Sequence, residues 1–155
     1  DGRPTFPKAR YLVPKADWDY YTKPSVLEKS PHVRDQVMPL EKLRIMDLIQ
    51  GEHRITDEVT AVPTPGHTPG HISIAIYSQG QRGFITGDMI SSPAQAHFTD
   101  WCPTYDLDKA EARKTRHQAL DRLEAERSLV YAGHFPDSGF GLFVRKEGRR
   151  VWQGV

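Results

Sequence analysis

Residues 64–88 read TPGHTPGHISIAIYSQGQRGFITGD, a stretch that contains a histidine loop, two strand-like runs and an aspartate. Over residues 71–77 the side chains alternate strictly, with isoleucines on one face and serine, alanine and tyrosine on the other. This period of two predicts a half-buried strand. A turn over residues 79–81 and a second run over 83–86 complete a predicted β-hairpin.

Strand and helix patterns alternate irregularly on both sides of this hairpin. The other strand-like runs are Tyr11–Val13, Val59–Pro63, Leu129–Ala132 and a C-terminal hairpin over Phe140–Val144 and Arg149–Trp152. The helical patterns are Asp17–Tyr21, Ser25–Gln50 with breaks at Pro31 and Pro39, and Asp108–Glu126. This order predicts an α/β fold with one mixed β-sheet and flanking helices. No repeat or linker divides the sequence, so we expect residues 1–155 to form a single domain.

The predicted helices have identifiable ends and faces. Asp17 and Asp108 are expected N-caps, the second in a capping box with Glu111, and Gly51 is an expected helix stop. The last helix has a buried stripe formed by Ala112, Ala119, Leu120 and Leu123. Its charged run from Lys109 to Arg127 is interpreted as a solvated face.

Composition restricts the function classes. The chain has 155 residues, 21 basic against 20 acidic side chains and no apolar run long enough for a membrane span, so neither a nucleic-acid nor a membrane partner is expected. The single cysteine, Cys102, excludes an internal disulfide and fits a reducing compartment such as the cytoplasm. The sequence starts at Asp1 with loop-like residues 1–7, and we expect an upstream segment to have been removed.

Three groups of residues have the chemistry of a metal site. The loop before the hairpin contains His67 and His71, Asp88 follows the second hairpin strand, and His134 follows a third strand. Side chains at strand ends converge on one edge of a sheet, where ligands usually bind. Two imidazoles and a carboxylate suit zinc or a similar metal. Each residue also has an ordinary alternative, as a turn residue, a strand-end cap or a packed histidine.

The joint pattern resembles the later metal motifs of the metallo-β-lactamase superfamily. Asp88 follows His67 by 21 residues, and His134 follows Asp88 by 46. Residues 86–90, the loop through Trp101 and residues 132–136 are similar to the branch that includes methyl parathion hydrolase and the quorum-quenching lactonases. The resemblance implies that this chain is the C-terminal half of an αββα sandwich.

The resemblance also implies roles for these residues. His67 would bind one metal, Asp88 would bridge two metals and act in catalysis, and His134 would bind the second, with His71 as a hydrogen-bonding neighbour. The family's other ligands come from a His-x-His-x-Asp-His motif, which is absent from the sequence. We therefore expect two zinc ions in a full-length form, and one weakly bound ion or none in this chain.

The activity implied by the resemblance is metal-assisted hydrolysis of a lactone, ester or phosphoester. Phe98, Trp101 and Phe135 are candidates for an apolar substrate wall, with ordinary packing as an equal alternative. Two other functions remain open. One is a persulfide dioxygenase using a single iron, and the other is a non-catalytic interaction domain.

The missing half has consequences for activity and assembly. A chain without the upstream motif is expected to be inactive or nearly so. If the family's first sheet is absent, the remaining sheet exposes an apolar face, which predicts a homodimer or a larger oligomer.

Overall fold

The computed structural model describes residues 4–155, and the chain divides into two compact units between Gln50 and Gly51. The expectation of a single domain stays a prediction. Residues 4–7 contain no helix or strand, as expected for a loop, whereas residues 1–3 of that predicted loop lie outside the described residues. No helix within residues 4–155 is both long and apolar enough to cross a bilayer.

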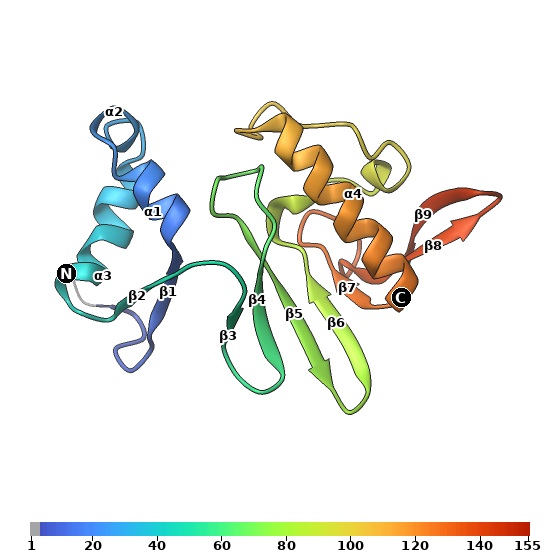
Figure 1. Ribbon diagram of the computed structural model, residues 1–155, viewed down its shortest axis with the longest axis horizontal. Helices are drawn as coiled ribbons and strands as arrows, with labels where there is room; N and C mark the ends of the chain where they lie inside the picture. The colour runs from blue at the N-terminus through green and yellow to red at the C-terminus, as the bar shows by residue number, and fades with distance from the viewer. Residues whose placement is uncertain (1–3) are drawn as a thin grey trace. The chain divides into compact units, whose positions relative to one another are not determined.

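The first unit combines a two-stranded parallel sheet with short helices (Figure 1). Its strands are β1 (Tyr11–Pro14) and β2 (Met46–Ile49). Its helices are α1 (Lys15–Tyr21), α2 (Pro24–Leu27), the π-helical turn η1 (Val33–Val37) and α3 (Met38–Lys42). The predicted strand at residues 11–13 and the short helix through Tyr21 agree with this structure.

Three predictions for the first unit and its end are wrong. Residues 46–49 form a strand rather than the end of a helix, because α3 ends before Arg44, whose backbone φ is 58°, and β1 supplies a hydrogen-bonding partner. Gly51 therefore follows a strand and stops no helix. Asp17 is not an N-cap either, since α1 begins at Lys15 without a side-chain cap, and Asp17 lies in its first turn.

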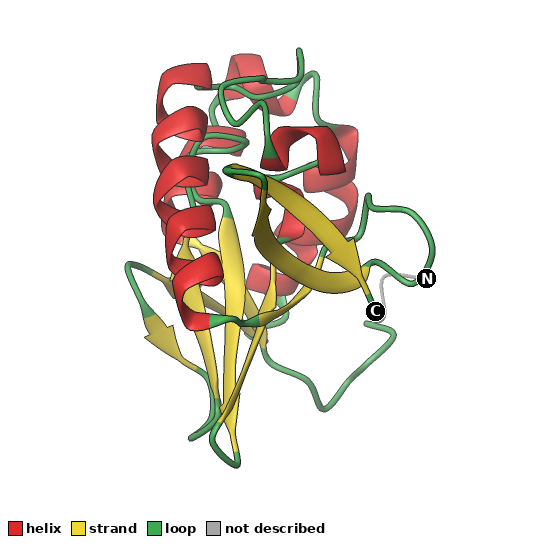
Figure 2. Cartoon of the chain, turned by 90° about the vertical axis from the view of Figure 1, so that its right-hand side faces the viewer, coloured by secondary structure: helices red, strands yellow, loops and turns green. Residues whose placement is uncertain are grey.

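The second unit contains a mixed sheet with the strand order β3-β4-β5-β6-β7-β8-β9. The strands are β3 (His53–Arg54), β4 (Val59–Pro63), β5 (Ile72–Ser78), β6 (Gln81–Ile85), β7 (Leu129–Tyr131), β8 (Phe140–Lys146) and β9 (Arg149–Gly154). Two short 3-10 helices, η2 (Gly87–Met89) and η3 (Pro93–Ala96), precede α4 (Lys109–Glu126). Both predicted hairpins, β5–β6 and β8–β9, are confirmed, and Figure 2 shows the second one curving beside the C-terminus.

Helix α4 lies on one face of this sheet and covers the core (Figure 1). Leu120 and Leu123 of the helix pack with Phe84 of β6 and Val130 of β7, all at most 5% exposed. The helix begins where the sequence predicts, because the Asp108 side chain accepts a hydrogen bond from the backbone N–H of Glu111 at 2.9 Å. The predicted capping box is only half formed, because the backbone N–H of Asp108 donates to Gly66 O at 2.9 Å rather than to the Glu111 side chain.

The opposite face of the sheet carries exposed apolar side chains over β6–β8. The strand register places Ile74, Ile85, Tyr131 and Phe140 side by side across β5, β6, β7 and β8. Ile85 is 37% exposed, Tyr131 37% and Phe140 44%. Such a face is what the family resemblance implied for a chain without the first sheet.

The charged run of α4 is not wholly solvated, so this interpretation is wrong at one position. Arg116 is 1% exposed and lies on the helix stripe four residues after Ala112 and four before Leu120. Its burial is possible because its guanidinium donates hydrogen bonds to Met89 O, Thr99 O and Trp101 O.

Candidate metal-binding site

Three predicted ligands lie at one edge of the second unit's sheet. His67 belongs to the loop from β4 to β5, Asp88 to η2 directly after β6, and His134 to the turn after β7. Because β5 is antiparallel to both β4 and β6, and β7 is parallel to β6, these connections emerge at the same edge.

Asp88 lies between the two histidines. Its Oδ1 is 2.8 Å from His134 Nε2, and its Oδ2 is 3.4 Å from His67 Nε2. The side chains of Asp88 and His134 are 46% and 55% exposed, whereas that of His67 is 19% exposed. One carboxylate therefore directs each oxygen to a different imidazole, on a face open to solvent.

His71 joins the histidine loop to the backbone of Asp88. Its Nε2 lies 2.9 Å from the backbone nitrogen of Asp88, and its Nδ1 lies 2.8 Å from Thr64 Oγ1 and 3.0 Å from Thr64 O. A backbone N–H can only donate, so Nε2 is the acceptor and the neutral ring carries its proton on Nδ1. These contacts are those expected of a neighbour that shapes the site, although the role itself stays a prediction.

Two glycines allow these close approaches. Gly87 has φ 54°, and a Cβ there would lie 2.7 Å from His71 Nε2. Gly66 has φ 130°, and its Cβ would lie 2.3 Å from the backbone of Ala112 in α4. Both positions require glycine because of the backbone conformation and the lack of space.

A buried ion pair that was not predicted from the sequence contacts His67. Asp106, whose side chain is 1% exposed, lies with Oδ1 3.2 Å from His67 Nδ1 and with Oδ2 3.3 Å from the terminal nitrogen of Arg116. The helical spacing of Arg116 within the apolar stripe was an available signal. Nothing in the local sequence marks Asp106, which comes near His67 only through the fold.

The predicted substrate wall divides into two parts. Phe98 and Trp101 are 45% and 58% exposed and stack with ring centroids 4.3 Å apart. Phe135 is 7% exposed and packs against Phe143 and Trp152 in the core, which is the packing alternative that the sequence left open. A further exposed aromatic ring, Tyr105, meets His67 edge to face at 5.7 Å.

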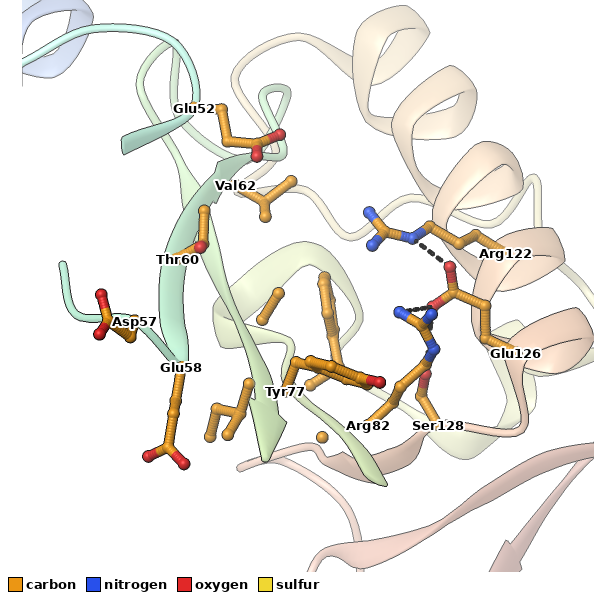
Figure 3. Close-up of a pocket in the computed structure, with 14 residues that line it drawn as sticks. Glu52, Asp57, Glu58, Thr60, Val62, Tyr77, Arg82, Arg122, Glu126 and Ser128 are labelled. Carbon is orange, nitrogen blue, oxygen red and sulfur yellow. Dashed lines mark hydrogen bonds and ion pairs between the residues drawn. The ribbon is translucent and has the colours of Figure 1, made fainter. Parts of the chain in front are cut away.

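A separate cavity of about 180 Å³ lies between strands β4–β6 and α4 (Figure 3). Arg122 donates a hydrogen bond to Glu126 at 3.0 Å in this cavity, and Arg82 lies beside the ring of Tyr77. None of the predicted site residues lines it. The cavity is therefore distinct from the Asp88 edge.

The donor types at Asp88 fit zinc, but the donor number does not complete a site. Two imidazole nitrogens and a carboxylate are common zinc ligands, whereas structural and catalytic zinc sites use four ligand positions. Among residues 4–155 no group of three or more histidine, cysteine, aspartate or glutamate side chains has a metal-holding arrangement. His67, Asp88 and His134 thus offer zinc-type donor atoms, but only a partial set of them.

Comparisons with known proteins give the context for this partial set. Residues 7–134 match the family described as the metallo-beta-lactamase superfamily. An N-acyl homoserine lactonase of Bacillus thuringiensis is 22% identical over 133 residues, which cover 86% of this chain and 50% of the lactonase. A lactonase of Bacillus cereus is 21% identical over the same lengths. The chain therefore spans about half the length of the curated relatives it matches.

Solved structures show the same fold. A structure described as hydrolase AbOPH in the beta lactamase superfamily has a TM-score of 0.88 at 21% identity, covering 100% of this chain and 58% of that one. AidC, described as a dizinc quorum-quenching lactonase, has a TM-score of 0.85 at 19% identity, covering 99% and 57%. These similarities confirm the predicted α/β fold with a mixed sheet, which again corresponds to about half of the longer chains.

Proposed function

Because this chain belongs to the metallo-β-lactamase superfamily, we propose that His67, Asp88 and His134 are metal ligands of a hydrolytic site. The observation that carries the proposal is the placement of Asp88, whose two oxygens face the Nε2 atoms of two different histidines. A carboxylate with this placement suits two neighbouring cations and offsets part of their charge.

The remaining ligands would come from a segment that these 155 residues do not include. A zinc pair held by the completed site would supply hydroxide near neutral pH. His67 and His134 contribute neutral Nε2 donors, while His71 fixes the backbone of Asp88 by accepting its N–H. We propose that this chain alone binds at most one zinc ion weakly and is inactive or nearly so.

The proposed substrate class is a lactone, ester or phosphoester. The curated relatives are N-acyl homoserine lactonases, which favours hydrolysis over the dioxygenase alternative. Phe98 and Trp101 offer a flat, exposed apolar surface that suits the hydrocarbon part of a small substrate. Phe135 is not part of this proposed surface, because it is buried in the core.

Zinc titration of the metal-stripped chain, followed by elemental analysis, tests the ligand assignment. We expect less than one weakly bound ion per chain, and we expect His67→Ala and Asp88→Ala each to abolish its binding. His117→Ala is the matched control, because His117 is half-exposed and pairs with Asp100 rather than with Asp88. Equal zinc binding by wild type, H67A and D88A would exclude these residues as ligands.

Activity assays separate the remaining alternatives. Wild-type chain should show negligible hydrolysis of an aliphatic lactone, an aryl ester and a phosphotriester, with or without added zinc. Supplying a segment that contains the His-x-His-x-Asp-His motif should produce zinc-dependent hydrolysis. Oxygen consumption with a thiol persulfide, without hydrolysis of these substrates, would support the iron dioxygenase. Partner binding or cellular function that D88A leaves unchanged would support a non-catalytic interaction domain.

We also propose that the exposed sheet face joins two copies of this chain. Cross-strand neighbours Ile85, Tyr131 and Phe140, together with the 43% exposed Leu129, form a continuous apolar surface over β6–β8. A second copy of the same face would remove this apolar surface from water, and a two-fold pair uses the same patch on both chains. Sedimentation at micromolar concentration tests this, and a stable monomer would contradict it.

A further inference from the structure

The buried Asp106–Arg116 pair is in direct contact with His67. Both side chains are only 1% exposed, and the guanidinium nitrogen lies 3.3 Å from Asp106 Oδ2. The other carboxylate oxygen, Oδ1, lies 3.2 Å from Nδ1 of His67. The carboxylate thus has a permanent cation on one side and a candidate metal ligand on the other.

We propose that Asp106 is a positioning residue that keeps the proton of His67 on Nδ1 and thereby directs the Nε2 lone pair toward Asp88. Arg116 fixes the carboxylate for this task. The inference deepens the proposed function and rests on it for the identity of the ion. The protonation of the His67 ring, however, is measurable in metal-free protein.

The difference in burial between Asp88 and Asp106 decides which nitrogen of His67 carries the proton. A neutral imidazole has one donor and one acceptor, and a carboxylate accepts only. If the proton were on Nε2, it would point to Asp88, while Asp106 Oδ1 would face a lone pair. Asp88 is 46% exposed and can obtain its hydrogen bonds from water, whereas Asp106 is 1% exposed and cannot. The proton therefore belongs on Nδ1.

Arg116 links this hydrogen bond to the turn that carries Asp88. Its Nε donates to Met89 O at 3.0 Å, one residue beyond Asp88, while its terminal nitrogen holds Asp106. Two backbone hydrogen bonds join the Asp106 loop to the histidine loop, from Leu107 N to His67 O at 3.2 Å and from Asp108 N to Gly66 O at 2.9 Å. The Arg116 guanidinium thus holds both the carboxylate beside His67 and the backbone next to Asp88, which fixes the two side chains relative to each other.

The Tyr105 ring limits the orientation of His67 further. It meets the imidazole edge to face, with centroids 5.7 Å apart and planes at 75°. The His71 ring lies 5.8 Å from His67 at 80°. With both neighbours in place and Nδ1 bonded to Asp106, the imidazole keeps Nε2 directed at the open side of the site. Such outer partners commonly fix the ring and tautomer of metal-binding histidines.

Asp106→Asn tests the inference with nearly unchanged shape. Arg116 only donates, so it must take the amide oxygen of the new residue, which leaves the amide NH₂ group facing His67 Nδ1. Nδ1 then has to accept, and the proton moves to Nε2. Long-range ¹H–¹⁵N NMR of the metal-free chain, at a pH where its histidines are neutral, reads this change directly. His71, whose proton is on Nδ1, serves as an internal reference.

Asp100→Asn is the matched control. Asp100 Oδ1 lies 2.9 Å from His117 Nε2, so the substitution again replaces a carboxylate beside a histidine, but at a half-exposed pair away from Asp88. We expect D100N to leave the His67 tautomer and zinc affinity unchanged. We expect D106N to shift the tautomer and to weaken zinc binding about 10- to 100-fold.

The outcomes distinguish this inference from the proposed function. An Nε2-protonated His67 in the wild type overturns the inference, even if D106N fails to fold. An unchanged tautomer and zinc affinity in a folded D106N variant also overturn it, while leaving the ligand assignment intact. Equal zinc binding by wild type, H67A and D88A, with the expected tautomer change present in D106N, overturns the proposed function and keeps the Asp106–His67 geometry.

Discussion

Replacing Arg116 with methionine keeps the length of the buried side chain and removes its charge. Asp106, only 1% exposed, is then a buried carboxylate without its cation. Removing one partner of a buried ion pair typically destabilises a protein by about 3–5 kcal/mol. Thr99 O and Met89 O also lose a donor, whereas Trp101 O keeps a hydrogen bond from Gln95 Nε2 at 2.7 Å.

We expect R116M to lower the free energy of unfolding by at least about 3 kcal/mol, a large part of the roughly 5–15 kcal/mol typical of a domain. With a urea dependence of about 1–3 kcal/mol per molar, the unfolding midpoint should fall by about 1 M or more. Urea titrations followed by circular dichroism measure this shift. Each titration should be run at two protein concentrations, because an oligomer would make the midpoint depend on concentration.

The double variant R116M/D106L separates charge burial from packing. Replacing both members of a buried ion pair by apolar side chains is often neutral or stabilising, so most of the lost stability should return. The double variant should nevertheless bind zinc more weakly than wild type, because His67 has lost its Nδ1 acceptor. A midpoint for R116M within about 0.2 M of wild type, or a double variant no more stable than the single one, would refute this reasoning.

The remaining predictions concern α4, the histidine loop and the apolar face. Burial acts to raise the pKa of the Glu124 carboxyl, but hydrogen bonds from Arg150 and Arg145, at 2.7 and 2.6 Å, outweigh it and hold the pKa below its ordinary value. The stability that the Glu124 carboxylate contributes is fully present above its pKa in the unfolded chain, and it is lost as the pH falls through its pKa in the folded chain. E124Q should therefore be less stable than wild type at pH 7 by about 1–3 kcal/mol, and the difference should vanish in acid. E111Q, which removes the exposed ion pair with Lys114, is the control and should change stability by no more than about 0.5 kcal/mol. A loss of stability in E124Q that is the same at every pH would contradict the role given to the Glu124 charge. Gly66→Ala should destabilise the chain more than Gly80→Ala does. Both glycines have positive φ, but of the two only a Cβ at residue 66 would meet backbone atoms, at 2.3 Å from Ala112. Equal melting temperatures of the two variants would disprove this. Tyr131→Glu should shift sedimentation toward the monomer, whereas Tyr77→Glu, an equally large change on the other face of the sheet, should not.

Local sequence was sufficient for most of the second unit. Strict alternation from Ile72, the Gly80 turn and the Asp108 cap each depend on neighbours within a few residues, and all three appear in the structure as predicted. The spacing of His67, Asp88 and His134 also indicated one site, and the fold brings them together around the carboxylate. Their assignment as metal ligands stays a prediction.

Tertiary structure decided the features that depend on distant partners. Residues 46–49 have helix-compatible spacing but become a strand because β1, 35 positions earlier in the register, supplies their hydrogen bonds. Arg116 is charged and would be expected at the surface, yet it is buried because carbonyl groups of three separate residues and Asp106 surround it. Asp106 itself has no local signal. Its partnership with His67 joins residues 39 positions apart, and such a contact forms only when the whole chain has folded.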